Sequence, residues 1–174
     1  MFKELNILKL FFETPSKEYN VREIARKLKI APATASKDLD SLSNMNILEK
    51  RKERNFTLFK ANFEGDLYLD LKVFYNIRKL KDTKLIEEIN KFYGKPSIIL
   101  FGSMSQGLDR EHSDIDLLII SEKVSEFPLK EKYEKLFHRN IHLFVYRKIS
   151  DEKNKHLINN MINGILLQGE IKWI

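Results

Sequence analysis

Cysteine is absent from this chain of 174 residues, and proline, glycine and tryptophan are scarce, with four, six and one residues. Without cysteine, neither disulfide bonds nor a thiolate zinc site can form. No apolar run approaches the ~20 residues of a membrane-spanning helix. The N-terminus has Lys3 and Glu4 inside an amphipathic pattern, unlike a signal peptide. The sequence therefore predicts a cytoplasmic protein with no membrane partner.

Charged residues are unevenly distributed along the chain. Charged side chains make up 32% and apolar side chains 43% of the sequence, the balance of a globular protein. Residues 1–60 contain 13 Lys and Arg against 8 Asp and Glu, whereas residues 61–174 contain 18 against 17. Most of the net charge of +6 therefore lies in the first third, which makes this segment the candidate for binding a polyanion.

Two continuous apolar runs, residues 98–101 and 117–120, are typical of strands buried on both faces. Asp114 and Asp116 come just before the second run. Because alternate side chains of a strand share a face, both aspartates are expected on one side, with Ile115 in the core. Neighbouring carboxylates repel each other unless a cation neutralises them, and Mg²⁺ suits a few hard oxygens completed by phosphate and water. The pattern therefore predicts Asp114 and Asp116 as metal ligands.

The segment between the two runs has the features of a phosphate-binding turn. Gly102 lets the backbone approach a ligand closely, and a helix starting after it would offer free amide groups to an anion. Ser103 adds a hydroxyl at this turn, and a polar loop then leads back to the second strand. We predict a triphosphate held by Gly102 and Ser103 and bridged by the metal to the two aspartates.

The run of Gly102-Ser103, ten further residues and Asp114-x-Asp116 resembles the signature of the DNA polymerase beta-like nucleotidyltransferases. In compactness the chain looks like the minimal members found in prokaryotes. The resemblance implies a mixed-sheet α/β core and transfer of a nucleoside monophosphate from ATP or another nucleoside triphosphate to an acceptor, dependent on Mg²⁺ or Mn²⁺. Minimal members often modify a partner toxin, so a partner protein such as a cognate toxin is expected. The implied catalytic residues are Asp114 and Asp116, and the implied nucleotide-binding residues are Gly102, Ser103, Gly107 and Ser113.

One position departs from the family pattern. The superfamily usually places a third carboxylate on a later strand, and the matching strand here, residues 140–146, has His142 in that place. A neutral imidazole can bind a metal or accept a proton, but it brings no negative charge and prefers softer cations than Mg²⁺. His142 is thus a third candidate metal ligand or a polar strand-edge residue without a catalytic task. The alternative function is a DNA-binding regulator whose nucleotidyltransferase-like domain binds nucleotide without turnover.

The basic first third has the pattern of a winged helix-turn-helix. A first helix is expected to end near residues 14–15, a second to begin at Asn20, and a third at Pro32, where proline suits the first turn. Residues 47–59 then predict two short strands around a basic turn. This segment resembles the winged-helix DNA-binding domains of prokaryotic regulators, with the third helix in the major groove. The DNA-contacting residues expected from it are Thr34, Ser36, Lys37, Arg51, Lys52 and Arg54.

The predicted fold class is α+β, with three segments. A winged helix-turn-helix domain spans residues 1–62, connecting helices span 63–93, and an α/β nucleotidyltransferase domain with a mixed sheet spans 94–174. Asp151 is expected to cap the final helix. Acidic residues in the wing leave open a solvated hairpin or a protein-docking role, and since winged helices commonly pair, a homodimer is open as well.

Overall fold

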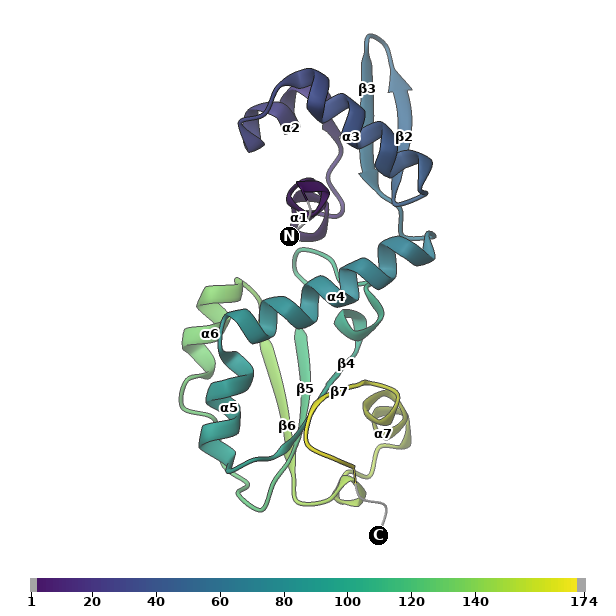
Figure 1. Ribbon diagram of the computed structural model, residues 1–174. Coiled ribbons are helices and arrows are strands. Elements are labelled where there is room, and N and C mark those ends of the chain that lie inside the picture. Colours follow the sequence, from purple (N-terminus) through teal and green to yellow (C-terminus); the bar gives the residue numbers. More distant parts are fainter. Residues whose placement is uncertain (1–2, 172–174) are drawn as a thin grey trace. The chain divides into compact units, whose positions relative to one another are not determined.

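The computed structural model describes residues 3–171 and divides into two units, Met1–Tyr75 and Asn76–Ile174 (Figure 1). The division falls inside helix α4, which spans Asp66–Asp82. It also lies within the predicted connecting segment, residues 63–93. In the part of the chain that the structure describes, no helix is both long and apolar enough to cross a bilayer.

The first unit combines helices with an antiparallel sheet of strand order β1-β3-β2. Its elements are α1 (Lys3–Glu13), β1 (Tyr19–Asn20), α2 (Val21–Leu28), α3 (Pro32–Asn44), β2 (Leu48–Glu53) and β3 (Phe56–Ala61), followed by α4. The β2–β3 hairpin turns at Arg54, which adopts a left-handed φ of 50°. A short helix, a tight turn, a second helix and a β hairpin together form the predicted winged helix-turn-helix.

The ends of α2 and α3 follow from their sequences. The Asn20 side chain accepts a hydrogen bond from the Glu23 amide at 3.0 Å, and the Glu23 carboxylate accepts one from the Asn20 amide at 3.0 Å. This reciprocal pair is the capping box of a helix start. Lys29 ends α2 with a left-handed φ of 56°, and Pro32 begins α3, where a missing N–H is tolerated. The two helices are therefore joined by a tight turn between defined ends.

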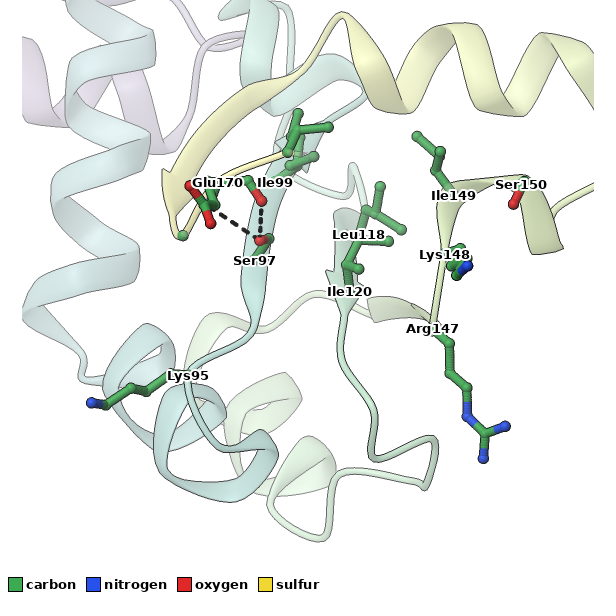
Figure 2. Close-up of a pocket in the computed structure, with 12 residues that line it drawn as sticks. Lys95, Ser97, Ile99, Leu118, Ile120, Arg147, Lys148, Ile149, Ser150 and Glu170 are labelled. Atoms are coloured by element: carbon green, nitrogen blue, oxygen red, sulfur yellow. Dashed lines mark hydrogen bonds between the residues drawn. The ribbon is translucent and has the colours of Figure 1, made fainter. Parts of the chain in front are cut away.

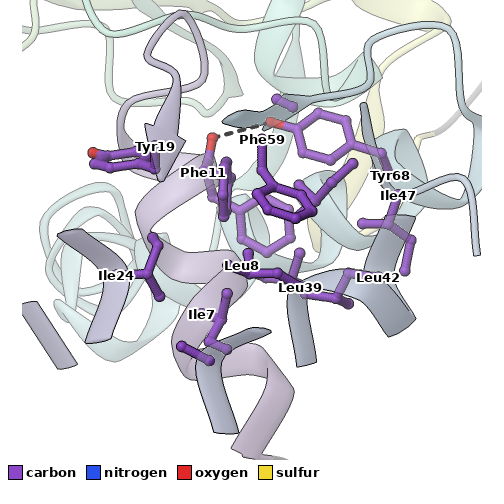
Figure 3. Close-up of a cluster of buried hydrophobic side chains, with 14 of the residues drawn as sticks. Ile7, Leu8, Phe11, Tyr19, Ile24, Leu39, Leu42, Ile47, Phe59 and Tyr68 are labelled. Carbon is purple, nitrogen blue, oxygen red and sulfur yellow. Dashed lines mark hydrogen bonds between the residues drawn. The ribbon is translucent and has the colours of Figure 1, made fainter. Parts of the chain in front are cut away.

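Buried side chains from α1, α2, α3, the sheet and α4 form the core of the first unit (Figure 3). Phe11 and Phe59 are at most 1% exposed. The Tyr68 hydroxyl of α4 donates to the backbone oxygen of Phe11 at 3.2 Å, the bond drawn in Figure 3. The buried Lys72 ammonium donates to the backbone oxygen of Phe12. These two donors of α4 satisfy carbonyls of the last turn of α1, which a helix end leaves without intrahelical partners.

The second unit is built on a four-stranded sheet of order β6-β5-β4-β7. Its elements after α4 are α5 (Leu85–Tyr93), β4 (Ser97–Phe101), η1 (Ser103–Gln106), β5 (Ile115–Ile120), α6 (Lys130–Phe137), β6 (Ile141–Tyr146), η2 (Ile149–Asp151), α7 (Lys155–Ile162) and β7 (Ile165–Gln168). Strands β5 and β6 are parallel, while β4 is antiparallel to both β5 and β7. The predicted fold class, with a mixed sheet in the second domain, is confirmed.

Helices cover both faces of this sheet, as the unbroken apolar runs of β4 and β5 predict. On one face, Ile98 and Leu117 pack with side chains of α5 and α6. On the other face, Leu118 packs with Met161 of α7. Because side chains alternate along a strand, Asp116 lies on the face that α7 covers.

The start of the last helix differs from the prediction. Asp151 does not cap α7; it ends the short η2 turn, and its carboxylate accepts from the Lys148 amide at 3.1 Å. The cap is Asn154, whose side chain accepts from the amides of His156 and Leu157 at 3.1 and 3.3 Å. Both Asp and Asn are favoured caps. Residue type therefore does not distinguish the two positions. Asp151 is not the cap because its carboxylate already bonds the Lys148 amide in the preceding turn.

A buried polar network holds the loop between η1 and β5. Asp109 in this loop is 0% exposed. Its carboxylate accepts from Arg139 Nη1 at 2.8 Å and from Asn76 Nδ2 at 2.7 Å. Asn76 Nδ2 also donates to the backbone oxygen of Met104 at 3.0 Å. Since a buried charge is stable only when it is paired and hydrogen-bonded, these contacts determine where the loop lies.

Asp109→Asn removes the negative charge that faces the Arg139 guanidinium. We expect the second unit to lose about 3–5 kcal/mol of stability, because one partner of a buried ion pair is lost. Amide hydrogen exchange in β4 and β5 measures this loss. Asp82→Asn is the matched control, since Asp82 pairs with Arg78 on an exposed helix turn, where an ion pair contributes less than about 1 kcal/mol. Equal effects of the two variants would contradict the proposed role of the network.

Candidate functional site

The turn after β4 is shaped around Gly102. This residue has a φ of 69° and a ψ of −159°, a region that is essentially restricted to glycine. The Ser105 hydroxyl donates to the Gly102 oxygen at 2.8 Å, and Gly107, with a φ of 72°, follows η1. The predicted helix start after Gly102 is therefore a short 3₁₀ turn of four residues. The macrodipole of a long α-helix is not part of this site.

Asp116 lies directly against this turn. The antiparallel register of β4 and β5 places Asp116 opposite Phe101, the residue before Gly102. A Cβ atom built on Gly102 would lie 2.5 Å from Asp116 Oδ2, closer than such atoms can approach. Glycine is therefore required here by its backbone angles, and a side chain at this position would force the Asp116 carboxylate to rotate away. The structure brings Gly102 and Asp116 together.

Asp114 comes one residue before β5 and is held by the segment that leads into β6. Asn140 Nδ2 donates to Asp114 Oδ1 at 3.0 Å, and the backbone oxygen of Asn140 accepts from the Ile115 amide at 2.9 Å. Ile115 is fully buried, as predicted. Asp114 and Asp116 are both partly exposed. A ligand can therefore reach both carboxylates, and Asn140 orients the first of them.

His142 lies beside Asp116 on the neighbouring strand. The parallel register of β5 and β6 pairs the two residues. Nδ1 of His142 is 3.0 Å from Asp116 Oδ1, and the side chains of His142 and Asp116 are 46% and 23% exposed. With Nδ1 bonded to Asp116, Nε2 is the nitrogen that can face a ligand. His142, which the sequence matches to the third carboxylate position of the family, therefore lies next to Asp116 in the structure.

The other predicted nucleotide-binding residues lie in or beside the loop that follows β4. Ser103 is the first residue of η1 and is partly exposed. The Ser113 hydroxyl accepts from the Arg110 amide at 2.9 Å. Gly107 is buried and its amide donates to the Ser103 oxygen. The described contacts of Gly107 and of the Ser113 hydroxyl are thus within the loop.

The donor atoms of this site are compatible with a divalent cation. Asp114 and Asp116 supply hard carboxylate oxygens, and Mg²⁺ is often held by one or two carboxylates together with substrate phosphates. The missing Cβ at Gly102 keeps Asp116 Oδ2 open on that side. Across residues 3–171, no group of three or more His, Cys, Asp or Glu side chains has the arrangement of a metal site.

The predicted DNA-contacting residues of α3 lie near the start of the helix. Thr34 and Lys37 are exposed, and Ser36 is half-buried. The N-terminal residues of a recognition helix are the ones that contact base edges in helix-turn-helix proteins. Thr34 and Lys37 are therefore the more accessible members of this set.

The basic residues of the wing differ in how their charges are compensated. Arg51 donates to Glu18 at 2.8 and 2.5 Å and contacts Glu53 at 2.6 Å. The bonds from Arg51 lower the pKa of Glu18, and the bonds to both carboxylates raise the pKa of Arg51. Lys52 and Arg54 are exposed, and among the described residues neither has an acidic side chain within ion-pair distance. Two of the predicted wing contacts thus have uncompensated charge, and Arg51 is bound to carboxylates of its own chain.

Three residues that support the site were not identified from the sequence: Asp109, Arg139 and Asn140. Asp109 and Arg139 are 30 residues apart, and only the folded chain brings them together. Asn140 could have been identified, because it stands two residues before His142 at the start of the strand that carries the third position.

Comparison with known protein families assigns both parts of the chain. Residues 82–166 match the family described as "Nucleotidyltransferase domain". Residues 3–50 match the family described as "Bacterial regulatory protein, arsR family". The chain therefore contains a nucleotidyltransferase domain fused to an N-terminal helix-turn-helix domain of the arsR family, the architecture that the two sequence patterns predict.

One solved structure with similarity to the chain is described as "Crystal structure of the toxin-antitoxin with AMP-PNP". It has a TM-score of 0.42 and 23% sequence identity, over 51% of this chain and 73% of that chain. A comparison with curated proteins finds no match.

Gly102→Ala places a Cβ against Asp116 in a backbone region that alanine avoids, so we expect β4 and β5 to lose stability. The control is the same substitution in an Asp116→Ala background, where the backbone strain at residue 102 is unchanged and the carboxylate is absent. Backbone strain of this kind costs about 1–3 kcal/mol, and the Asp116→Ala background measures it alone. The additional loss in the wild-type background, read from amide exchange in β4 and β5, measures the contact with Asp116. Equal losses in the two backgrounds would show that this contact does not constrain residue 102.

Proposed function

We propose that this protein transfers AMP from ATP to a hydroxyl group of a protein or small-molecule acceptor, in a Mg²⁺-dependent reaction, and binds DNA through its winged helix. The observation that carries the proposal is the contact of Gly102 with Asp116, which sets a carboxylate against a glycine turn followed by Ser103. The nucleotidyltransferase family match supports the class of reaction. The identities of the nucleotide, the metal and the acceptor are part of the proposal.

The proposed reaction joins the acceptor oxygen to the α-phosphorus of the nucleotide as the bond to the β-phosphate breaks and pyrophosphate leaves. The turn at Gly102 would position the triphosphate, with the Ser103 hydroxyl donating to a phosphate oxygen. Asp114 and Asp116 would hold the divalent cation, which neutralises phosphate charge. Nε2 of His142 would take the proton of the acceptor hydroxyl, while Nδ1 donates to Asp116.

A second candidate function is a DNA-binding regulator in which the nucleotidyltransferase domain binds nucleotide without transferring it. His142 favours this candidate, because the imidazole beside Asp116 brings no negative charge to a metal. Both candidates use the same aspartates to bind nucleotide. They differ in whether the proton of an acceptor is removed.

The proposed partners are a nucleoside triphosphate, DNA and an acceptor protein such as a cognate toxin. The arsR-family match supports DNA binding. We propose the exposed side chains of Thr34, Lys37, Lys52 and Arg54 as its main contacts. DNA binding would require a cytoplasmic location, and a homodimer would place two recognition helices on successive half-sites.

The transfer reaction is tested with purified protein, ATP labelled in its α-phosphate, Mg²⁺ or Mn²⁺, and a cell lysate. We expect label on a macromolecule with the wild type and a loss of about 10²-fold or more with Asp114→Asn or Asp116→Asn, since each removes a carboxylate charge that would hold the divalent cation. DNA binding by the same preparations is the control for folding and should not change.

Failure of the wild type with every nucleoside triphosphate, with nucleotide binding intact, would favour the second candidate. His142→Asp separates the two candidates in the same assay. If the wild type is inactive because the imidazole prevents turnover, the new carboxylate should produce transfer. If the wild type is active and His142 removes the acceptor proton, the variant should transfer more slowly than the wild type.

Lys52→Ala and Arg54→Ala should each weaken DNA binding and lower the slope of log K against log salt by about one unit, because each removes a phosphate contact. Arg51→Ala should have a smaller effect, since Glu18 and Glu53 already compensate its charge. Glu18→Gln should strengthen binding, because Glu53 would be the one described carboxylate still paired with Arg51. DNA titrations at several salt concentrations measure all four variants, and equal losses with the three alanine variants would contradict this charge assignment.

A further inference from the structure

A hollow of about 1020 Å³ opens on the α7 face of the sheet, at the end where β5 and β6 finish (Figure 2). Its apolar lining includes Ile120, Ile149 and Ile171, which are partly exposed, together with the buried Ile99 and Leu118. We call this hollow the β5 groove. Its apolar surface lies outside the nucleotide site and has no part in the reaction described above.

The rim of the β5 groove is positively charged. Three basic residues with exposed side chains line it: Lys95, Arg147 and Lys148. Figure 2 shows Lys95 on one side of the central strands and Arg147 on the other. Among the described residues, none of these three side chains forms an ion pair with a carboxylate, and the described lining has one acidic residue, Glu170. An occupant with an apolar centre and negative charge at both margins would be complementary to this groove.

The exposure of the groove favours a protein segment over a small molecule. Small-molecule sites bury most of the ligand, whereas the isoleucines of this groove are partly exposed. Two turns of an α-helix, about 10 Å wide and about 11 Å long, occupy about 850 Å³. Amphipathic helices bind grooves of this kind through apolar residues spaced three and four apart.

We propose that the β5 groove binds an amphipathic helix of a partner protein. The apolar face of the helix would contact the three isoleucines, and acidic side chains on both of its flanks would lie beside the basic rim. This binding requires neither nucleotide nor transfer, so it can be tested independently of the proposed reaction.

The test is a selection of random peptides of about 14 residues, or four helical turns, displayed on phage against the full chain. We expect enriched sequences to have apolar residues three and four apart, bordered by Asp and Glu. Arg147→Glu combined with Lys148→Glu should weaken binding of the best synthetic peptide about tenfold or more, measured by fluorescence anisotropy. Lys132→Glu combined with Lys135→Glu is the matched control: it makes the same charge change at exposed positions of α6, which covers the opposite face.

The apolar contact is tested with Ile171→Asp, which should also weaken binding of the peptide. Its control is Leu136→Asp, at an exposed position of α6.

The proposal would be overturned by a selection without enrichment, by enriched peptides without acidic residues, or by binding that the double charge reversal leaves intact. Two other occupants would overturn it as well. Binding to phosphatidylglycerol vesicles that is lost on charge reversal, without peptide enrichment, indicates a membrane surface, and a dimer that charge reversal dissociates indicates a second copy of the chain.

Discussion

The contact between the Gly102 turn and Asp116 is the constraint on which the candidate site of the second unit depends. It exists because β4 and β5 are antiparallel neighbours with Phe101 opposite Asp116, and because Gly102 has no Cβ and an unusual backbone conformation. A shift of one residue in this register would turn Asp116 towards the cluster that contains Leu117. The apolar strands therefore do more than stabilise the sheet, since their burial maintains the register that sets a carboxylate at the turn.

The loop between this turn and β5 is held by buried polar groups, which here replace the hydrogen bonds of a regular element. Asn76 of α4 and Arg139 bind Asp109 in the middle of the loop. Asn140, the next residue after Arg139, binds Asp114 at its end. Two consecutive residues before β6 thus determine two points of the loop. Such preorganisation suits transfer of a nucleotidyl group, in which the protein mainly positions charged groups.

Features that depend on local pattern could be predicted from the sequence, and features that depend on distant pairing could not. The buried strand over residues 98–101 and the capped helix of the helix-turn-helix follow from apolar runs and cap residues. The ion pair of Asp109 with Arg139 does not, because a charged residue in a polar loop has the same sequence pattern whether it is buried or exposed. The same holds for Arg51, whose partner Glu18 is 33 residues away. The basic character of the first third therefore overestimates the charge that the wing offers to DNA.

The β5 groove and the proposed transfer site share one face of the sheet, which connects binding with chemistry. Asp116 and Ile120 are four residues apart in β5 and lie on the same side, about 13 Å apart along the strand. A helix held in the groove would leave the aspartates uncovered and keep the attached protein near them. Its acceptor group would then be present at a high effective concentration, whatever its own affinity for the site. A small site built around two aspartates and a glycine turn could in this way modify one protein selectively, with recognition in the groove and transfer at Asp116.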